Sequence, residues 1–81
     1  MATKHKVIDK HGVPHKRVSM NRVYAYAVVT WYRPYEFRGE TIYPSASATW
    51  CSRLDLAQKE FNRRRGYANV TDVEIIPATI G

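Results

Sequence analysis

The feature that most constrains the fold is the segment Val23–Tyr32, which contains no glycine, proline or charged residue. Nearly all of its side chains are β-branched, aromatic or alanine, a composition typical of a β-strand. Successive side chains of a strand point to opposite sides, so one face carries Val23, Ala25, Ala27, Val29 and Trp31. The other face carries Tyr24, Tyr26, Val28, Thr30 and Tyr32. We predict that a helix packs on the alanine face and that the tyrosine face meets solvent or a partner.

The positive charge is concentrated near the N-terminus. The chain has a net charge of +6, and residues 1–22 carry six basic groups against one acidic group. The six are Lys4, Lys6, Lys10, Lys16, Arg17 and Arg22. We interpret residues 1–21 as a basic, flexible arm, broken by Gly12 and Pro14, in which Val7 and Ile8 can form a short edge strand. Such an arm suits nucleic acid or an acidic protein surface, or is only a solubilising tail.

Length and cysteine content limit the class of protein. The chain has 81 residues, so we predict a single small domain, residues 22–81, after the arm. Cys51 is the only cysteine, which excludes an internal disulfide and fits a reducing compartment. The N-terminus has no apolar signal-peptide segment, and the longest apolar run is too short to cross a bilayer. We therefore expect a cytoplasmic protein with no membrane partner.

The segment Arg33–Pro44 predicts a long loop, or a loose hairpin with a short strand at Thr41–Tyr43. Pro34 ends the preceding strand because it has no N–H for a strand ladder. Aromatic and arginine residues on a long loop often form a contact surface. The alternative is that Phe37 and Ile42 fold back over the core.

A helix is predicted from Arg53 to Arg65. The pattern Ser-x-x-Asp at its start indicates a capping box, with Ser52 as the cap and Asp55 in the first turn. The apolar stripe of this helix consists of Leu54, Ala57 and Phe61. Opposite charges four residues apart form the pairs Asp55/Lys59 and Glu60/Arg64.

Two short strands flank this helix, at Ser45–Cys51 and at Val70–Ile76, where Pro77 ends the second. The expected inner face of the second strand carries Thr71, Val73 and Ile75. The predicted fold class is α+β: a small, mostly antiparallel sheet of three or more strands with one helix packed across one face.

The sequence shows no catalytic motif. It contains no glycine-rich phosphate loop, no Gly-x-Ser-x-Gly, no His-Glu-x-x-His and no Cys-x-x-Cys. His5, His11 and His15 lie in the N-terminal segment without a cysteine or carboxylate pair to complete a metal site. We therefore predict neither an enzyme nor a metal site nor a cofactor.

A surface that combines aromatic and basic side chains is the candidate binding site. Its residues are Tyr24, Tyr26, Tyr32, Arg33, Tyr35 and Arg38. Such side chains stack bases and hold phosphates, and they also dominate protein interfaces. Tyrosine rings that simply cover a sheet are the alternative. Further basic contacts are expected from Lys4, Lys6, Lys10, Lys16, Arg17, Arg63, Arg64 and Arg65.

Three segments carry a resemblance to a known group: Asn21–Val29, Trp50–Ala57, and Gly66-Tyr67 leading to Val73–Pro77. They resemble small accessory proteins of bacteriophages, especially actinobacterial phages, in an Arg-x-Tyr strand, a Ser-Arg-x-Asp-Leu-Ala helix start and a closing strand ending in Val/Ile-Pro. The resemblance covers about two thirds of the chain, its motifs are structural, and the aromatic loop and basic arm depart from it. It implies a host-directed binder or inhibitor, of the kind that acts on bacterial defence systems.

We therefore predict a non-catalytic binding protein, a phage-type accessory factor that binds and modulates or inhibits a host protein such as a defence or nucleic-acid machine. Outside residues 1–22 the chain is nearly neutral, which favours an aromatic anchor patch for a protein partner. The alternative is a small basic nucleic-acid-binding protein with weak sequence specificity, whose phosphate contacts come from the arm.

Overall fold

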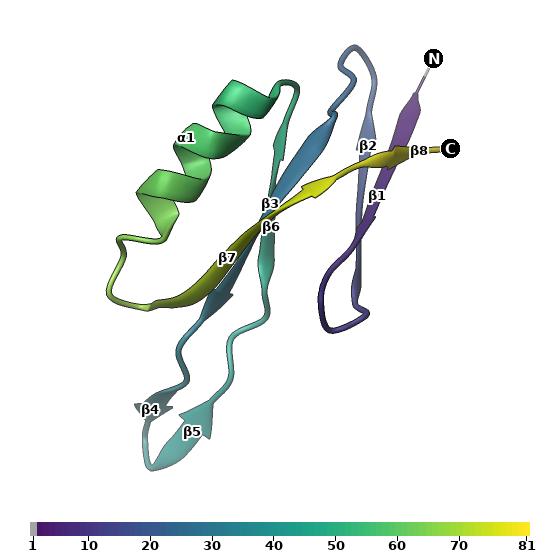
Figure 1. Cartoon of the computed structure of the whole chain (residues 1–81). Helices are drawn as coiled ribbons and strands as arrows, with labels where there is room; N and C mark the ends of the chain where they lie inside the picture. The colour runs from purple at the N-terminus through teal and green to yellow at the C-terminus, as the bar shows by residue number, and fades with distance from the viewer. Residues whose placement is uncertain (1) are drawn as a thin grey trace.

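The computed structural model describes residues 2–81, which form eight strands and one helix (Figure 1). In chain order they are β1 (Thr3–Ile8), β2 (Pro14–Ser19), β3 (Tyr26–Tyr32), β4 (Tyr35–Phe37), β5 (Glu40–Ile42), β6 (Ser47–Cys51), α1 (Leu54–Arg64), β7 (Val70–Pro77) and β8 (Thr79–Ile80). The strands form antiparallel sheets in the orders β2–β1–β8, β6–β3–β7 and β4–β5. The predicted α+β class, with one helix on a sheet face, is confirmed.

Strand β3 lies at the centre of the molecule. It pairs antiparallel with β6 on one side and with β7 on the other. Strands β6 and β7 therefore run parallel to each other, with β3 between them, and α1 connects them across one face (Figure 1). The strands predicted on either side of the helix are confirmed, but the central strand begins at Tyr26 rather than at Val23.

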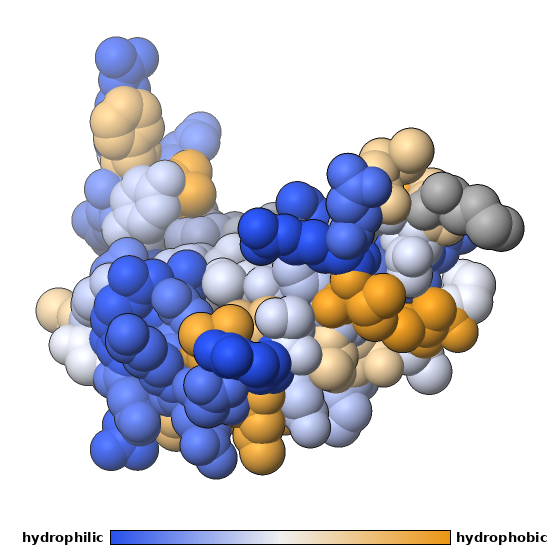
Figure 2. Space-filling view, turned by 90° about the horizontal axis from the view of Figure 1, so that it is seen from above, coloured by the Kyte–Doolittle hydropathy of each residue, from blue (hydrophilic) through white to orange (hydrophobic). Residues whose placement is uncertain are grey.

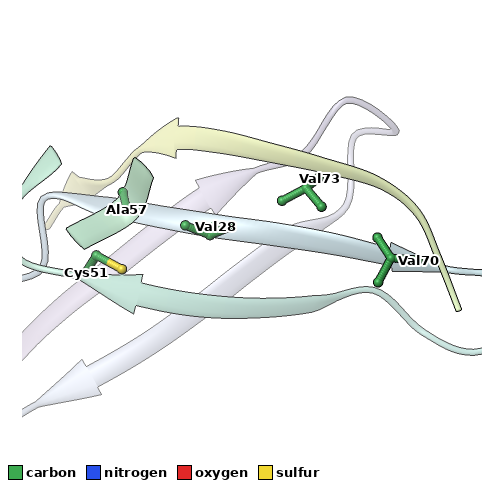
Figure 3. Close-up of a cluster of buried hydrophobic side chains, with 5 residues drawn as sticks. All are labelled: Val28, Cys51, Ala57, Val70 and Val73. Carbon is green, nitrogen blue, oxygen red and sulfur yellow. The ribbon is translucent and has the colours of Figure 1, made fainter. Parts of the chain in front are cut away.

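The helix covers the face of β3 opposite to the one predicted. Between α1 and the sheet lies a cluster of buried residues, in which α1 contributes Ala57. The other members are Val28, Cys51, Val70 and Val73 (Figure 3). Tyr26, Tyr32, Phe61 and Ile75 pack around this cluster. The prediction that the helix packs on the alanine face is therefore wrong. The tyrosine rings and Val28 offer more apolar area to a helix than alanine methyl groups do.

The alanine face of β3 is covered by the N-terminal hairpin, formed by β1 and β2. Val7 from β1 is buried with Ala27 and Val29 of β3 in a second cluster. Around it pack Trp31, Ala46, Ala48, Trp50, Ile76 and Ala78. The small side chain of Ala27 does permit a close approach, but the approaching element is a strand.

The N-terminal hairpin differs from the arm that the sequence predicts. Strands β1 and β2 pair over six residues each, and β8 pairs with the other edge of β1. The predicted edge strand at Val7 and Ile8 is the end of this longer strand. Hydrophobic periodicity misses it because two of its inward side chains, His5 and the adjoining Asp9, are polar and still buried.

The start of the helix also differs from the prediction. Arg53 occupies the N-cap position in extended conformation, and no side chain caps the helix, so the predicted Ser52 cap is wrong. The helix begins at Leu54, and Ala57 is the buried residue of its predicted stripe, whereas Leu54 and the neighbouring Leu56 are exposed. The predicted ion pair between Glu60 and Arg64 is present, at 3.1 Å. The predicted pair of Asp55 with Lys59 is wrong, because Asp55 pairs with Arg53 at 3.2 Å instead.

Strands β4 and β5 form a second hairpin, the projecting hairpin, which extends away from both larger sheets (Figure 1). Its two-residue turn has positive φ at Arg38 (52°) and Gly39 (79°), the geometry of a tight hairpin turn. Phe37 is 57% exposed, so it does not fold back over the core, whereas Ile42 is half-buried. The hairpin alternative of the sequence analysis is therefore the correct one.

Candidate functional site

The outward face of the β2–β1–β8 sheet carries three lysines, Lys4, Lys6 and Lys16, which we call the lysine face. In the strand register Lys6 lies directly opposite Lys16, and Lys4 follows two residues along β1. All three lysines are exposed. His5 and Val7, which alternate with Lys4 and Lys6 along β1, point inward and are buried. A hollow of about 240 Å³ opens beside these lysines and Arg17.

No carboxylate within residues 2–81 forms an ion pair with the lysine face. Asp9 is the only acidic residue of the first 22, and its carboxylate is buried and directed at His15. Like charges directly opposite each other on a sheet repel. The lysine face therefore presents positive charge that has no ion-pair partner among residues 2–81, and an external anion would relieve the repulsion.

His5 holds the hairpin in place. Its Nδ1 donates to the carbonyl of Arg17 at 3.2 Å, and its Nε2 accepts from the backbone N–H of Tyr24 at 2.9 Å. This pattern requires the neutral ring with its proton on Nδ1. The ring also lies 5.2 Å from that of Tyr24 and 6.0 Å from that of Trp50. One buried histidine thus connects β1 to β2, β6 and the entrance of β3.

Asp9 organises the turn of the N-terminal hairpin. Its carboxylate accepts from the N–H groups of His11 (2.9 Å) and Val13 (3.0 Å), and it lies 2.9 Å from Nε2 of His15. Burial acts to raise the pKa of Asp9, but these hydrogen bonds outweigh burial, so the pKa lies below its ordinary value. The carboxylate is therefore a structural acceptor.

The same turn docks on the central sheet. The Lys10 amine lies 4.5 Å from the ring centre of Trp31 and forms an ion pair with Asp72. The His11 ring meets the Trp31 ring edge-on at 5.7 Å. Lys10, one of the predicted basic contacts, therefore has partners inside the molecule.

The six predicted partner-binding residues do not form one face. Tyr26 and Tyr32 pack against the cluster beneath the helix, and the Tyr32 hydroxyl lies 2.7 Å from that of Ser47. Tyr24 precedes β3 and packs against His5 on the other side of the sheet. Arg38 lies at the tip of the projecting hairpin, where its guanidinium is 5.2 Å from the Phe37 ring.

Three of the predicted residues do meet at the base of the projecting hairpin. Tyr32, Arg33 and Tyr35 line a groove of about 590 Å³ together with Pro34, Pro44, Ala68 and Asn69. The Arg33 side chain is fixed there, because its Nε donates to the carbonyl of Ala68 at 3.0 Å. Tyr35 is 54% exposed. This groove is largely apolar and has one immobilised cation.

A groove that the sequence analysis missed lies between the segment before β3, strand β6 and the helix. Its volume is about 410 Å³, and its lining includes Arg22, Tyr24, Trp50, Lys59, Glu60 and Arg63. We call it the Tyr24–Trp50 groove. Both aromatic rings are half-buried and therefore held in place. Strand alternation is the signal that marks Trp50 in the sequence, and it places this residue on one strand face with Ala46 and Ala48.

The basic residues at the end of α1 have partners of their own. Glu60 accepts from Arg63 at 2.6 Å and from Arg64 at 3.1 Å. Burial acts to raise the pKa of Glu60, but these two arginines outweigh it and lower the pKa. The bond to Glu60 raises the pKa of Arg63, and Arg65 lies 5.6 Å from the ring of Phe61. These arginines, which were predicted as basic contacts, are therefore less available to an external anion than the lysines of the lysine face.

Cys51 is a buried thiol beneath the helix. Burial raises its pKa, the Glu60 carboxylate adds to this effect, and Arg64 opposes it. A raised pKa keeps the group protonated at neutral pH, so Cys51 acts as a small apolar side chain.

Within residues 2–81 no helix is long and apolar enough to cross a membrane, and these residues contain no group of three or more potential metal ligands. Comparisons with protein-family models, with curated protein sequences and with solved structures find no match for this chain.

Proposed function

We propose that this protein is a non-catalytic binding protein that holds the phosphate backbone of nucleic acid on its lysine face. The observation that carries the proposal is the register of β1 and β2, which brings Lys4, Lys6 and Lys16 together without an acidic partner among residues 2–81. Phosphate contacts from lysine provide most of the affinity of non-specific nucleic-acid binding.

This proposal reverses the order that the sequence favours. A flexible arm would provide only loosely placed charge, whereas these lysines project from paired strands. The strands are anchored through His5 and Val7 to the central sheet. A folded scaffold loses less conformational entropy when it orders its cations around a chain of phosphates.

The test is equilibrium binding of labelled DNA and RNA at several salt concentrations. A Lys4→Gln/Lys6→Gln/Lys16→Gln variant should bind much more weakly, and its log–log salt dependence should become less steep by about 0.7–0.9 per lysine removed. The matched control is Lys10→Gln, which removes a lysine already paired with Asp72 and should bind as the parent does. Equal binding by the triple variant and the parent would refute the proposal.

A second candidate is binding of a protein, as expected for a phage-type accessory factor that modulates or inhibits a host protein. The observation that favours it is the projecting hairpin. Three aromatic residues on or next to it are more than half exposed, namely Tyr35, Phe37 and Tyr43. The groove lined by Tyr32, Arg33 and Tyr35 lies at its base. Exposed aromatic residues next to arginine are the composition of interface anchors.

The two candidates separate in one experiment, a pull-down from nuclease-treated bacterial lysate. Under the second candidate, Tyr35→Ser/Phe37→Ser abolishes capture of one defined protein and the triple lysine variant retains it. Under the first, nuclease removes the captured material and the hairpin variant behaves as the parent does.

A further inference from the structure

We infer that the Tyr24–Trp50 groove receives a base of single-stranded nucleic acid, so that the protein distinguishes single strands from duplexes. The inference rests on the proposed function, since the lysine face supplies the phosphate contacts. It assigns a role to Arg22 and Lys59, which neither the fold nor the lysine face requires, and to the part of Trp50 that lines the groove.

The groove has the size and the lining for a stacked base. Its volume of about 410 Å³ lies within the roughly 300–1,000 Å³ of small-molecule sites. Tyr24 and Trp50 both line it. Both pack against the buried ring of His5, whose centroid lies 5.2 Å from that of Tyr24 and 6.0 Å from that of Trp50. Aromatic rings with restricted motion stack bases at low entropic cost, and they accept any base because every base has a π-face.

Charge at the groove is complementary to phosphate. Glu60 is neutralised there by Arg63, at 2.6 Å, and by Arg64 behind it. Arg22 and Lys59 form no ion pair within residues 2–81. The groove therefore offers two cations beside two aromatic rings, the combination by which proteins bind single strands.

The groove continues from the hairpin that carries the lysine face. Arg17 of β2 lies with its guanidinium 5.8 Å from the ring of Tyr24 and also lines the hollow beside Lys4, Lys6 and Lys16. Arg17 lies opposite His5 in the strand register, so it projects from the face opposite to the lysine face. A strand that leaves the lysine face therefore crosses the edge strand β2 at Arg17 before its base reaches Tyr24. A duplex keeps its bases paired and stacked inside, so it can use the lysine face but not the groove.

Tryptophan fluorescence provides a direct readout, because the chain has two tryptophans. In the Trp31→Phe variant, Trp50 is the only reporter, and a short oligothymidylate should quench its emission. Inorganic polyphosphate, which has the charge but no bases, should not. The matched control is Trp50→Phe, in which Trp31 packs beneath Lys10 and should report no quenching. Thermal unfolding of both variants confirms that they fold.

Affinity provides the second readout. Tyr24→Leu should weaken binding of the oligothymidylate roughly 5- to 150-fold, the range for the loss of one base–aromatic stack, with little effect on a duplex of the same length. The matched control is Tyr43→Leu, at a residue that is 76% exposed and outside the groove, which should bind as the parent does. Arg22→Gln should weaken single-strand binding more than Arg53→Gln, which removes an arginine paired with Asp55.

Absence of quenching by the oligothymidylate, equal quenching by polyphosphate, or equal affinity of Tyr24→Leu and the parent for the single strand would each overturn the inference. If the triple lysine variant still loses binding in that case, the proposed function stands without a base-binding groove. If the lysine variant binds normally, the proposed function fails as well.

Discussion

Residues 2–81 contain the N-terminal hairpin and the projecting hairpin, which relate to the body of the protein in opposite ways. The N-terminal hairpin and the projecting hairpin both turn through a glycine with a φ of 79°. Three residues of the first hairpin and its turn, His5, Val7 and Asp9, are buried. The projecting hairpin has no buried residue in either strand. Two-stranded hairpins are marginally stable alone, so the first hairpin depends on its docking, a support that the strands of the second lack.

The N-terminal hairpin shows that buried polar side chains can anchor an otherwise polar hairpin to a sheet. His5 and Asp9 bring hydrogen-bonding partners into the interface, so their burial leaves no group unpaired there. The outer faces of the strands are then free to carry charge. Figure 2 shows the result, a surface on which hydrophobic side chains form small areas among hydrophilic ones.

The largest expected effect comes from removing a hairpin. Deletion of residues 1–16 removes Val7 and uncovers Ala27 and Val29, so cooperative thermal unfolding should be lost. Replacement of residues 34–43 by a short turn exposes no buried cluster and should preserve a cooperative transition. A cooperative transition in the N-terminal deletion would show that residues 1–21 are the separate arm that the sequence indicates.

The next effect is that of a single anchor. His5→Ala leaves the Tyr24 N–H and the Arg17 carbonyl without their partner, and each unsatisfied buried group costs about 1–3 kcal/mol. The free energy of unfolding, measured by urea denaturation, should therefore fall by about 2–6 kcal/mol. Phe37→Ala, in the projecting hairpin, should change it by less than about 0.5 kcal/mol because the ring is exposed. Similar losses in the two variants would remove the distinction between docked and projecting hairpins.

Acid should weaken the anchored hairpin through Asp9. The folded pKa of Asp9 lies below its ordinary value of 3.8, so the unfolded chain takes up this proton first as the pH falls. The stabilisation is therefore complete above about pH 4–5 and is lost as the pH falls through the folded pKa. Asp9→Asn should be less stable than the parent at neutral pH. The difference between the urea midpoints of the two proteins should become smaller in acid. A gap independent of pH would show that the carboxylate charge does not stabilise the turn.

The same contrast explains what the sequence could predict. The strands and helix around β3 follow from apolar periodicity, because each buries its apolar side chains against a neighbour. Apolar residues mark only the end of β1, at Val7 and Ile8. The rest of the strand could not be found in this way, since the partners that make the burial of His5 possible, Arg17 and Tyr24, are 12 and 19 residues away. The face chosen by the helix was missed for the same reason, because the hairpin that occupies the alanine face was not predicted.

The candidate site, like the fold, can be predicted from the sequence only in part. The lysines of the lysine face are visible in the sequence, but their convergence depends on the register that places Lys6 opposite Lys16. The row of tyrosines was assigned to one surface because strand alternation places alternate residues together. The strand begins only at Tyr26, so Tyr24 lies outside the alternation, and the helix covers Tyr26 and Tyr32. The Tyr24–Trp50 groove combines three segments and has no local signal in the sequence.

The smallest effect is expected from substitutions in the turn at the tip of the projecting hairpin. Arg38 has a φ of 52°, in the left-handed region that costs a non-glycine residue about 1–2 kcal/mol. Glycine relieves that cost but gains freedom in the unfolded chain, so Arg38→Gly should raise the free energy of unfolding by about 0.5–1 kcal/mol. Gly39→Ala, with a φ of 79° and open space around the position, should lower it through backbone strain alone. If the projecting hairpin unfolds together with the body, urea denaturation should show changes of opposite sign in the free energy of unfolding for Arg38→Gly and Gly39→Ala. If neither substitution moves the global midpoint, the projecting hairpin opens independently, and its aromatic side chains are presented on a segment that the core does not hold.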